Sequence, residues 1–129
     1  MDVVITEWGL QSYVDLVGRQ NAFGKKYYQS TIRPDVELLQ IYPKATKFQN
    51  GTFWSPVSIV SNGFKMKWHN VGPGNIQLRL PVFMHNGEAF LCEAYVKKGM
   101  KQEMRRLRKF QVRAKLIRQK RYQRRGVLP

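Results

Sequence analysis

Residues 63–96 read GFKMKWHNVGPGNIQLRLPVFMHNGEAFLCEAYV, and this stretch decides the fold. Its first seven residues alternate apolar and basic side chains, as a half-buried strand does. A turn at Gly72-Pro73-Gly74 separates them from a second strand over residues 76–84. Asn86-Gly87 is the strongest short hairpin signal in the chain, so we expect Ala89–Val96 to pair with the second strand. The stretch therefore predicts an antiparallel sheet.

The alternation in the first of these strands also predicts which side chains reach solvent. Its apolar side chains are expected to face the core, namely Phe64, Met66 and Trp68. Lys65, Lys67 and His69 then share the opposite face, and Arg79 projects from the neighbouring strand. This arrangement predicts a small group of basic side chains on one surface of the sheet.

Helical segments lie on both sides of this stretch in the sequence. A short β-branched strand, Val3–Thr6, opens the chain, and residues 8–20 then have apolar side chains at roughly helical spacing. Residues 21–42 predict a second helix that is interrupted near Pro34. Residues 100–124 contain neither Pro nor Gly and are rich in good helix formers, so we expect one helix there.

Length and composition fit one domain made of these elements. The chain has 129 residues, of which 43% are hydrophobic, so it can build a real core. We expect a single α+β domain over residues 1–129, with a small antiparallel sheet, two N-terminal helices and a long basic C-terminal helix. Cys92 is the only cysteine, which excludes an internal disulfide. With no long apolar run and no leader-like N-terminus, the chain is expected to be cytoplasmic and not to bind a membrane.

Positive charge is concentrated in the last quarter of the chain. The formal net charge is +15, and residues 1–96 are nearly balanced, with nine Lys/Arg against seven Asp/Glu. Residues 97–125 carry fourteen Lys/Arg against Glu103 alone. Such a block repels itself unless a polyanion or an acidic partner neutralises it, so the sequence predicts a nucleic-acid or acidic-protein partner. The simpler alternative is a solvated basic helix without a specific ligand.

Several catalytic systems are excluded by the sequence. It has no Gly-rich phosphate loop and no dinucleotide-binding glycine motif. His69 and His85 are not accompanied by Cys or carboxylates at zinc-binding spacings, and eight acids are few for a paired-acid hydrolase. A site that uses neither metal nor cofactor remains. RNA can be cut in such a site by activating its own 2′-hydroxyl, which requires a base, an acid and positive charge on the phosphate. Lys65, Lys67 and Arg79 could supply these functions, although each could also be an ordinary exposed strand residue.

The strands that carry these residues resemble those of the RelE family. Residues 64–72 resemble its aromatic-Lys-apolar-Lys strand, and residues 77–80 resemble the next strand, which holds a catalytic arginine. Residues 94–98 look like the apolar strand with a basic end that precedes the last helix. The basic tail is similar to the phage-related HigB branch of the RelE/ParE superfamily. The resemblance covers residues 60–125 well and residues 1–6 weakly.

This resemblance implies a toxin of a type II toxin–antitoxin system. Such a toxin enters the ribosomal A site, cleaves mRNA there as an endoribonuclease and inhibits translation, and a cognate antitoxin covers its basic surface. Residue by residue, Lys65 and Lys67 match the base and phosphate-binding lysines, and Arg79 matches the transition-state arginine. The expected RNA-binding residues are Lys97, Lys98, Lys101, Arg105, Arg106 and Trp68.

The sequence departs from the RelE pattern at one position and leaves two other functions open. Where the RelE branch carries a C-terminal tyrosine that stacks on the nucleobase, this sequence has Met104 or a residue near it. We expect Tyr95, His69 or Trp68 to provide stacking or acid–base function instead. The alternatives are a ParE-like toxin that acts on DNA gyrase, and a non-catalytic nucleic-acid-binding module that uses the basic helix only for electrostatic affinity.

Overall fold

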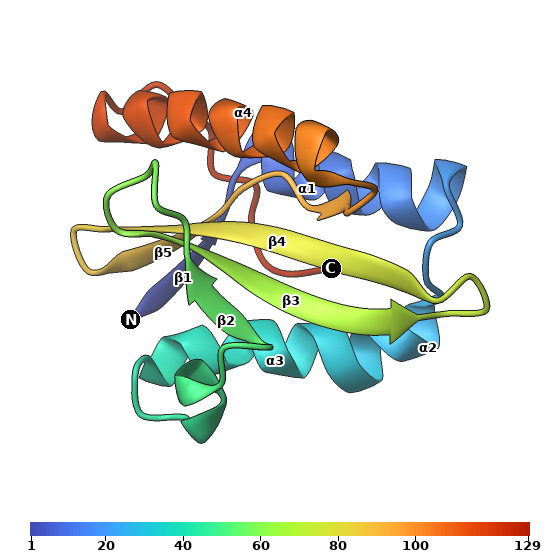
Figure 1. Ribbon diagram of the computed structural model, residues 1–129. Helices are drawn as coiled ribbons and strands as arrows, with labels where there is room; N and C mark the ends of the chain where they lie inside the picture. Colours follow the sequence, from blue (N-terminus) through green and yellow to red (C-terminus); the bar gives the residue numbers. More distant parts are fainter.

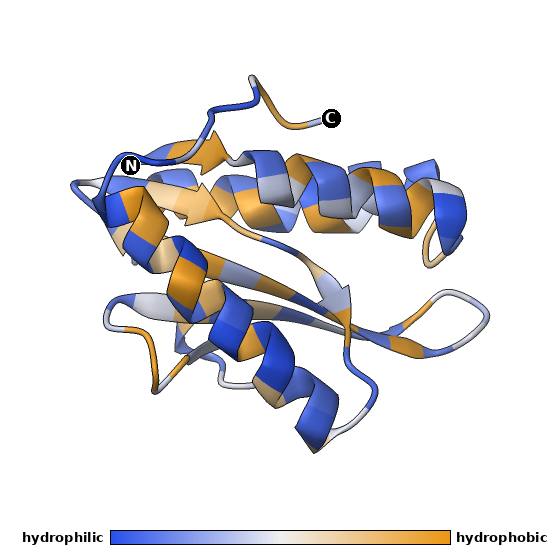
Figure 2. Ribbon diagram, turned by 90° about the horizontal axis from the view of Figure 1, so that it is seen from above, coloured by the Kyte–Doolittle hydropathy of each residue, from blue (hydrophilic) through white to orange (hydrophobic).

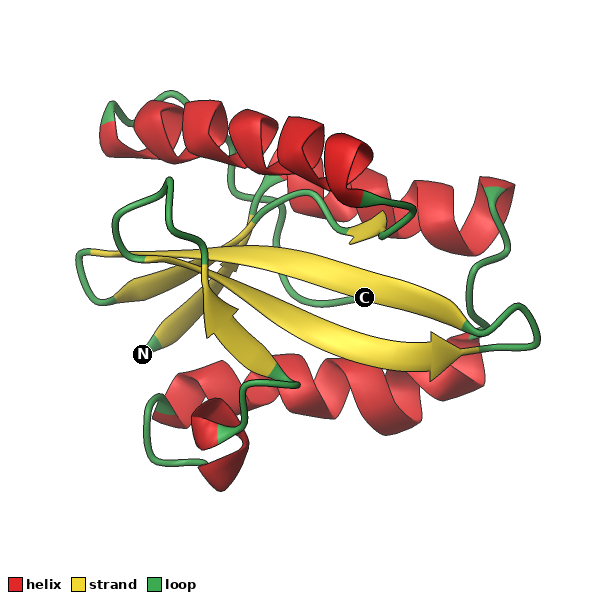
Figure 3. Ribbon diagram, viewed as in Figure 1, coloured by secondary structure: helices red, strands yellow, loops and turns green.

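A six-stranded mixed sheet lies between helices on its two faces (Figure 1, Figure 3). The computed structural model describes residues 1–129, and it confirms the predicted α+β class. The strands are β1 (Asp2–Ile5), β2 (Trp54–Pro56), β3 (Gly63–Val71), β4 (Ile76–His85), β5 (Glu88–Leu91) and β6 (Tyr95–Val96). The main helical elements are α1 (Glu7–Val14), α2 (Lys25–Tyr27), α3 (Arg33–Glu37) and α4 (Met100–Arg118). None of the helices combines the length and apolarity that crossing a bilayer requires.

The strands follow the order β1-β5-β4-β3-β2, and β6 also pairs with β4. The predicted hairpin is present, with His85 opposite Glu88 and a positive φ at both Asn86 and Gly87. The expectation of a purely antiparallel sheet is wrong, because β1 pairs with β5 in parallel. The chain between β1 and β5 is long and includes every other helix except α4, so no tight turn forces these two strands to run in opposite directions.

A β-bulge separates β5 from β6, which together replace the single strand predicted over residues 89–96. Val82 of β4 lies opposite Leu91, whereas Arg79 lies opposite Tyr95, so the register shifts by one residue between them. A shift of one residue moves every following side chain to the other face of a sheet. Phe90 and Tyr95 therefore both lie on the face that α4 covers, although regular alternation would separate them.

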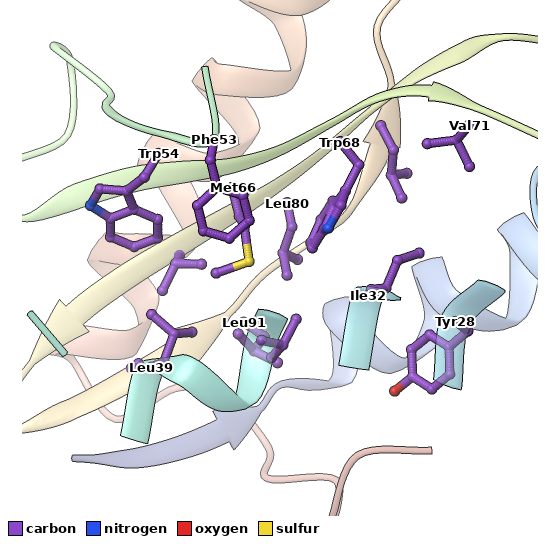
Figure 4. Close-up of a cluster of buried hydrophobic side chains, with 14 of the residues drawn as sticks. Tyr28, Ile32, Leu39, Phe53, Trp54, Met66, Trp68, Val71, Leu80 and Leu91 are labelled. Carbon is purple, nitrogen blue, oxygen red and sulfur yellow. The ribbon is translucent and has the colours of Figure 1, made fainter. Parts of the chain in front are cut away.

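Each face of the sheet has its own hydrophobic core. The larger core lies against the helical segment from α2 to α3, and Met66, Trp68 and Leu80 project into it from β3 and β4 (Figure 4). The smaller core lies under α4, where Phe110, Ala114 and Ile117 are buried against Phe83 and other residues. Seen from above, α4 crosses the sheet diagonally and is hydrophilic along most of its N-terminal half (Figure 2). The fully buried apolar residues of α4 thus lie in its C-terminal half, and Leu107 packs partly buried against the same core.

The helices depart from their predicted bounds at two places. The second N-terminal helix is not interrupted at Pro34: it continues through a wide turn at Tyr28–Ile32, directly before α3. Pro34 is the second residue of α3 and comes directly after this wide turn. Helix α4 ends at Arg118 rather than near Arg124, because Lys120 adopts a positive φ of 58°. The Lys120 and Arg121 amides then donate to the Ile117 and Leu116 carbonyls and close the helix.

The residues after α4 return to the edge of the sheet beside β1. Arg124 forms an isolated antiparallel bridge with Thr6, and the Arg125 amide donates to the Ile5 carbonyl at 2.9 Å. The Arg124 guanidinium also makes two 2.8 Å hydrogen bonds to the Glu88 carboxylate. The C-terminal tail is therefore tied to the outer side of β1 by backbone and side-chain contacts.

Helix α1 packs so closely against the β5–β6 bulge that its contact residue must be glycine. Adding a Cβ at Gly9 would place it 2.7 Å from the Leu91 carbonyl oxygen, and backbone cannot move aside cheaply. We expect Gly9→Ala to destabilise the chain by about 1–3 kcal/mol, the range of overpacking costs. Urea unfolding followed by circular dichroism would measure this loss.

Gly18 provides the matched control, because a Cβ added there meets no atom within 4 Å. Since Gly18 is also helical, Gly18→Ala should leave stability unchanged or raise it by up to about 1 kcal/mol. Equal stability of the two variants would contradict the close contact between α1 and the bulge.

Candidate functional site

The predicted basic residues of β3 and β4 lie on one face of the sheet. Lys67 pairs directly with Arg79, and Lys65 lies two residues before Lys67 on the same strand. Arg79 is in turn opposite Tyr95 of β6. His69 follows two residues after Lys67 and contacts Gln77 of β4. The three adjacent strands thus bring Lys65, Lys67, Arg79, His69 and Tyr95 together beside the N-terminal half of α4, and we call this surface the cationic face.

A carboxylate from α4 enters the cationic face. Glu103 accepts a hydrogen bond from the Lys65 ammonium and another from the Tyr95 hydroxyl, both at 2.9 Å. Burial raises the pKa of Glu103, but the two hydrogen bonds outweigh burial and hold this pKa below its ordinary value. Glu103 is therefore ionised near neutral pH and neutralises Lys65.

Lys67, unlike Lys65, has no carboxylate partner. Its ammonium donates to the Gly51 carbonyl oxygen at 2.5 Å. Burial lowers the pKa of Lys67 below its ordinary value, and nearby cations, among them Lys65 and Arg79, lower it further. A lysine with a lowered pKa releases its proton more readily and is the better candidate for a base.

Arg79 is a buried cation without a direct ion pair. Its side chain is only 5% exposed, and its Nη1 donates to the carbonyl oxygens of Trp68 and Leu78 at 3.4 and 3.1 Å. Its Nε has no hydrogen-bond partner. Burial lowers the pKa of Arg79, but a guanidinium remains charged at any physiological pH. An unpaired donor on a buried cation is costly, so this guanidinium is suited to binding an anion.

His69 is exposed at the edge of the cationic face and has both ring nitrogens occupied. Its Nδ1 lies 3.0 Å from the Gln77 amide oxygen, and its Nε2 lies 2.6 Å from the Thr52 carbonyl oxygen. Both partners are acceptors, so either ring nitrogen can donate to its partner. An imidazole is suited to proton transfer, which makes His69 a candidate proton donor.

Trp68 does not belong to this site, and its predicted role in binding RNA is wrong. Its side chain is 5% exposed and lies in the larger core on the opposite face of the sheet (Figure 4). Its indole N–H donates to Asp35 at 2.9 Å. Tyr95 is also unavailable for base stacking, because its ring is 2% exposed. Burial and the hydrogen bond to Glu103 raise the pKa of the Tyr95 hydroxyl, so it remains a donor.

The other predicted RNA-binding residues divide between two places. Lys98, Arg105 and Arg106 line a groove of about 800 Å³ between α4, β6 and the segment that follows α1. Lys97 lies close enough to Lys67 to affect its pKa and therefore belongs with the cationic face. Lys101 is exposed on the first turn of α4 and does not line the groove.

A second carboxylate lies under α4 outside the cationic face. Glu93, which lies within the bulge between β5 and β6, accepts from Arg106 at 2.7 Å and also from Arg113. It contacts neither Lys65 nor Arg79. Glu93 and Glu103 thus both hold α4 against the sheet, but only Glu103 does so inside the cationic face.

Sequence analysis did not identify Glu103 as part of the site. The signal was present, since Glu103 is the only acid among the residues from 97 to 125. A single acid within a strongly basic segment is expected to be paired with a specific cation. No group of three or more His, Cys, Asp and Glu side chains is placed to hold a metal ion. Comparison with models of protein families, with curated proteins and with solved structures gives no match to this chain.

Proposed function

We propose that this chain is a metal-free endoribonuclease that binds one phosphodiester on the cationic face. The observation that supports this proposal is the shared face of Lys65, Lys67 and Arg79 on two paired strands. Three cations brought together by the pairing of β3 with β4 match the dianionic, pentacoordinate phosphate that forms when a 2′-hydroxyl attacks. Their counter-charge on the chain is Glu103 alone at this face, so positive charge remains in excess.

The proposed reaction assigns one role to each group. Lys67 removes the proton of the 2′-hydroxyl, since its pKa is lowered and no carboxylate holds it. Arg79 donates to the non-bridging oxygens of the phosphate, where its unpaired Nε finds an acceptor. His69 donates a proton to the leaving 5′-oxygen. The products are a 2′,3′-cyclic phosphate and a free 5′-hydroxyl.

The biological setting of this proposal comes from the resemblance to the RelE and HigB toxins. In that setting the chain cleaves mRNA in the ribosomal A site, arrests translation and is neutralised by an antitoxin in the cytoplasm. The exposed cations of α4, such as Lys101 and Arg105, then contact the phosphates of mRNA and ribosomal RNA.

A second candidate function is non-catalytic binding of nucleic acid. Two observations favour it: Lys65 is neutralised by Glu103, and Arg79 is almost completely buried. The freely exposed cations lie on α4 and at the groove beside it, where they bind phosphates without chemistry. A binding module would need only these residues, and its affinity for nucleic acid would not depend on the cationic face.

Cleavage in the presence of a metal chelator distinguishes the two functions. The purified chain and EDTA are added to free RNA in one reaction and to mRNA in a translation mixture in another. The translation mixture contains magnesium in slight excess over EDTA, and breaks in both RNAs are mapped by primer extension. Defined 3′ fragments with 5′-hydroxyl ends, absent when the nucleotide 5′ of the break carries 2′-deoxyribose, would support the ribonuclease. Salt-dependent binding without breaks in either RNA would contradict it and favour the binding module.

A further inference from the structure

The N-terminal half of α4 is held over the sheet by polar contacts. Of the four buried residues of α4, three are apolar and lie in its C-terminal half, namely Phe110, Ala114 and Ile117. The fourth is Glu103, the only buried residue of the first two turns. Met100 is 83% exposed, and no side chain caps the start of the helix. The first turn of α4 is therefore attached through the Glu103 carboxylate, and the next turn also through the Arg106–Glu93 ion pair and the partly buried Leu107.

This carboxylate lies where an anion is needed. Its two oxygens accept from Lys65 and Tyr95, and it is the acid that stabilises the charge of Arg79. Arg79 nevertheless makes no ion pair with it, and the Arg79 Nε stays unpartnered although the residue is 95% buried. The Glu103 carboxylate satisfies Lys65 but leaves the Nε of the Arg79 guanidinium without an acceptor. A phosphodiester carries the same single charge as a carboxylate, but its tetrahedral geometry spreads its oxygens so that they can reach Lys65 and Arg79 together, and the pentacoordinate phosphate that forms from it is dianionic.

We propose that Glu103 is a resident anion of the cationic face, which an incoming phosphodiester displaces. The inference rests on the proposed use of this face for a phosphodiester. When the phosphate binds, Lys65 exchanges the carboxylate for phosphate oxygens, Arg79 gains an acceptor for its unpaired Nε, and the first turn of α4 moves with Glu103 toward solvent. The C-terminal half of α4 stays in place because its apolar anchors do not depend on this exchange.

Displacement of Glu103 has two consequences for the chain. Without a ligand, the carboxylate stabilises a cluster of buried like charges that would otherwise repel one another. With a ligand, the cost of releasing Glu103 is subtracted from the binding free energy, so anions that make only a few weak contacts with the face are rejected. Glu103 is thus a positioning and selectivity residue rather than a catalytic residue.

Binding of an RNA analogue that cannot be cleaved tests this proposal. The probe is a short 2′-O-methyl RNA, which has no free 2′-hydroxyl within the strand, and affinity is measured by fluorescence anisotropy at fixed ionic strength. Glu103→Gln keeps the size of the side chain and removes its charge. We expect it to bind the probe about tenfold more tightly or better, because the competing anion is gone.

Glu93→Gln is the matched control, since it removes one negative charge under the same helix but outside the cationic face. It should change affinity by less than about twofold to threefold, which is the general effect of one unit of charge. Equal affinities of the Glu103→Gln and Glu93→Gln variants would overturn the proposal. If Glu103→Gln does not fold, Tyr95→Phe serves instead, because it removes one of the two hydrogen bonds to Glu103 and keeps the ring. It should tighten binding severalfold, and unchanged or weaker binding would overturn the proposal.

The outcome is independent of cleavage. Tighter binding by Glu103→Gln in a chain that never cleaves RNA would support the resident anion and refute the ribonuclease. Cleavage by the wild-type chain with equal binding by the two Gln variants would support the ribonuclease and refute the resident anion.

Discussion

Replacing Arg79 by methionine should lower the rate of RNA cleavage by about two to three orders of magnitude, the usual cost of losing a preorganised transition-state donor. Arg79 is 5% exposed, and methionine fills a similar volume without charge. The strand should keep its place, because the neighbouring backbone groups are paired in the β3–β4 and β4–β6 ladders. The effect therefore belongs to the cationic face. Single-turnover cleavage of a defined message, with thermal unfolding as the check on folding, measures it.

Lys101→Met is the control for this result. Lys101 carries the same charge, is exposed on α4 and has no partner in the cationic face. Its replacement should weaken binding slightly and reduce the salt dependence, but leave the cleavage rate at saturation within about threefold of the wild-type rate. A folded Arg79→Met variant that cleaves at the wild-type rate would show that the reaction, if present, takes place elsewhere.

Phe110→Ala should be the most destabilising single substitution in α4, at about 3–5 kcal/mol. Phe110 is 2% exposed and lies directly over Gly63 of β3, where even one added carbon would be 2.9 Å from its ring. Removing the ring opens a cavity in the smaller core, which is the only apolar attachment of α4 to the sheet. Denaturant unfolding at constant m-value measures the loss.

Val112 lies on the same helix and is 59% exposed, so Val112→Ala provides the comparison. It should change stability by less than about 0.5 kcal/mol, as surface substitutions usually do. If Phe110→Ala costs less than about 1 kcal/mol, α4 does not depend on the smaller core for its position.

The sheet that carries the site was largely predictable from local sequence. Alternation in residues 63–69 and the Asn86-Gly87 turn are properties of adjacent residues, and both correspond to β3 and the β4–β5 hairpin. The same alternation predicted that Lys65 and Lys67 lie on the other face of the sheet from Met66 and Trp68, which are buried. Two predictions for Trp68 conflicted, because a side chain that faces the core cannot also stack on RNA. The structure places Trp68 in the core.

Features that depend on distant residues were not predictable. The parallel pairing of β1 with β5 joins segments more than 80 residues apart, and nothing in Val3–Thr6 specifies its partner. The bulge that turns Tyr95 toward α4 has no glycine or proline to indicate it. The end of α4 at Arg118 is set by a lysine in a left-handed conformation, which glycine more commonly adopts.

The candidate site shows the same division between local and long-range information. Spacing along β3 and β4 was enough to place Lys65, Lys67 and Arg79 on one face. The depth of Arg79 and the contact between Lys65 and Glu103 depend on how α4 crosses the sheet, which involves residues 38 apart. Burial decides whether a cation is free, and burial is a property of the whole fold.

The tail that returns to β1 also limits how copies of this chain can associate. One margin of the sheet is occupied at Ile5 and Thr6 by backbone contacts with the tail, and the other margin is β2, which has three residues and includes Pro56. An exposed strand margin is the template from which edge-to-edge aggregation grows, and proline or a covering segment blocks it. Association of copies through their sheet edges into fibres is therefore disfavoured. This holds even though α4 leaves apolar residues such as Val112 at the surface. Shortening the tail before Arg124 would remove that protection, so we expect the truncated chain to aggregate more readily.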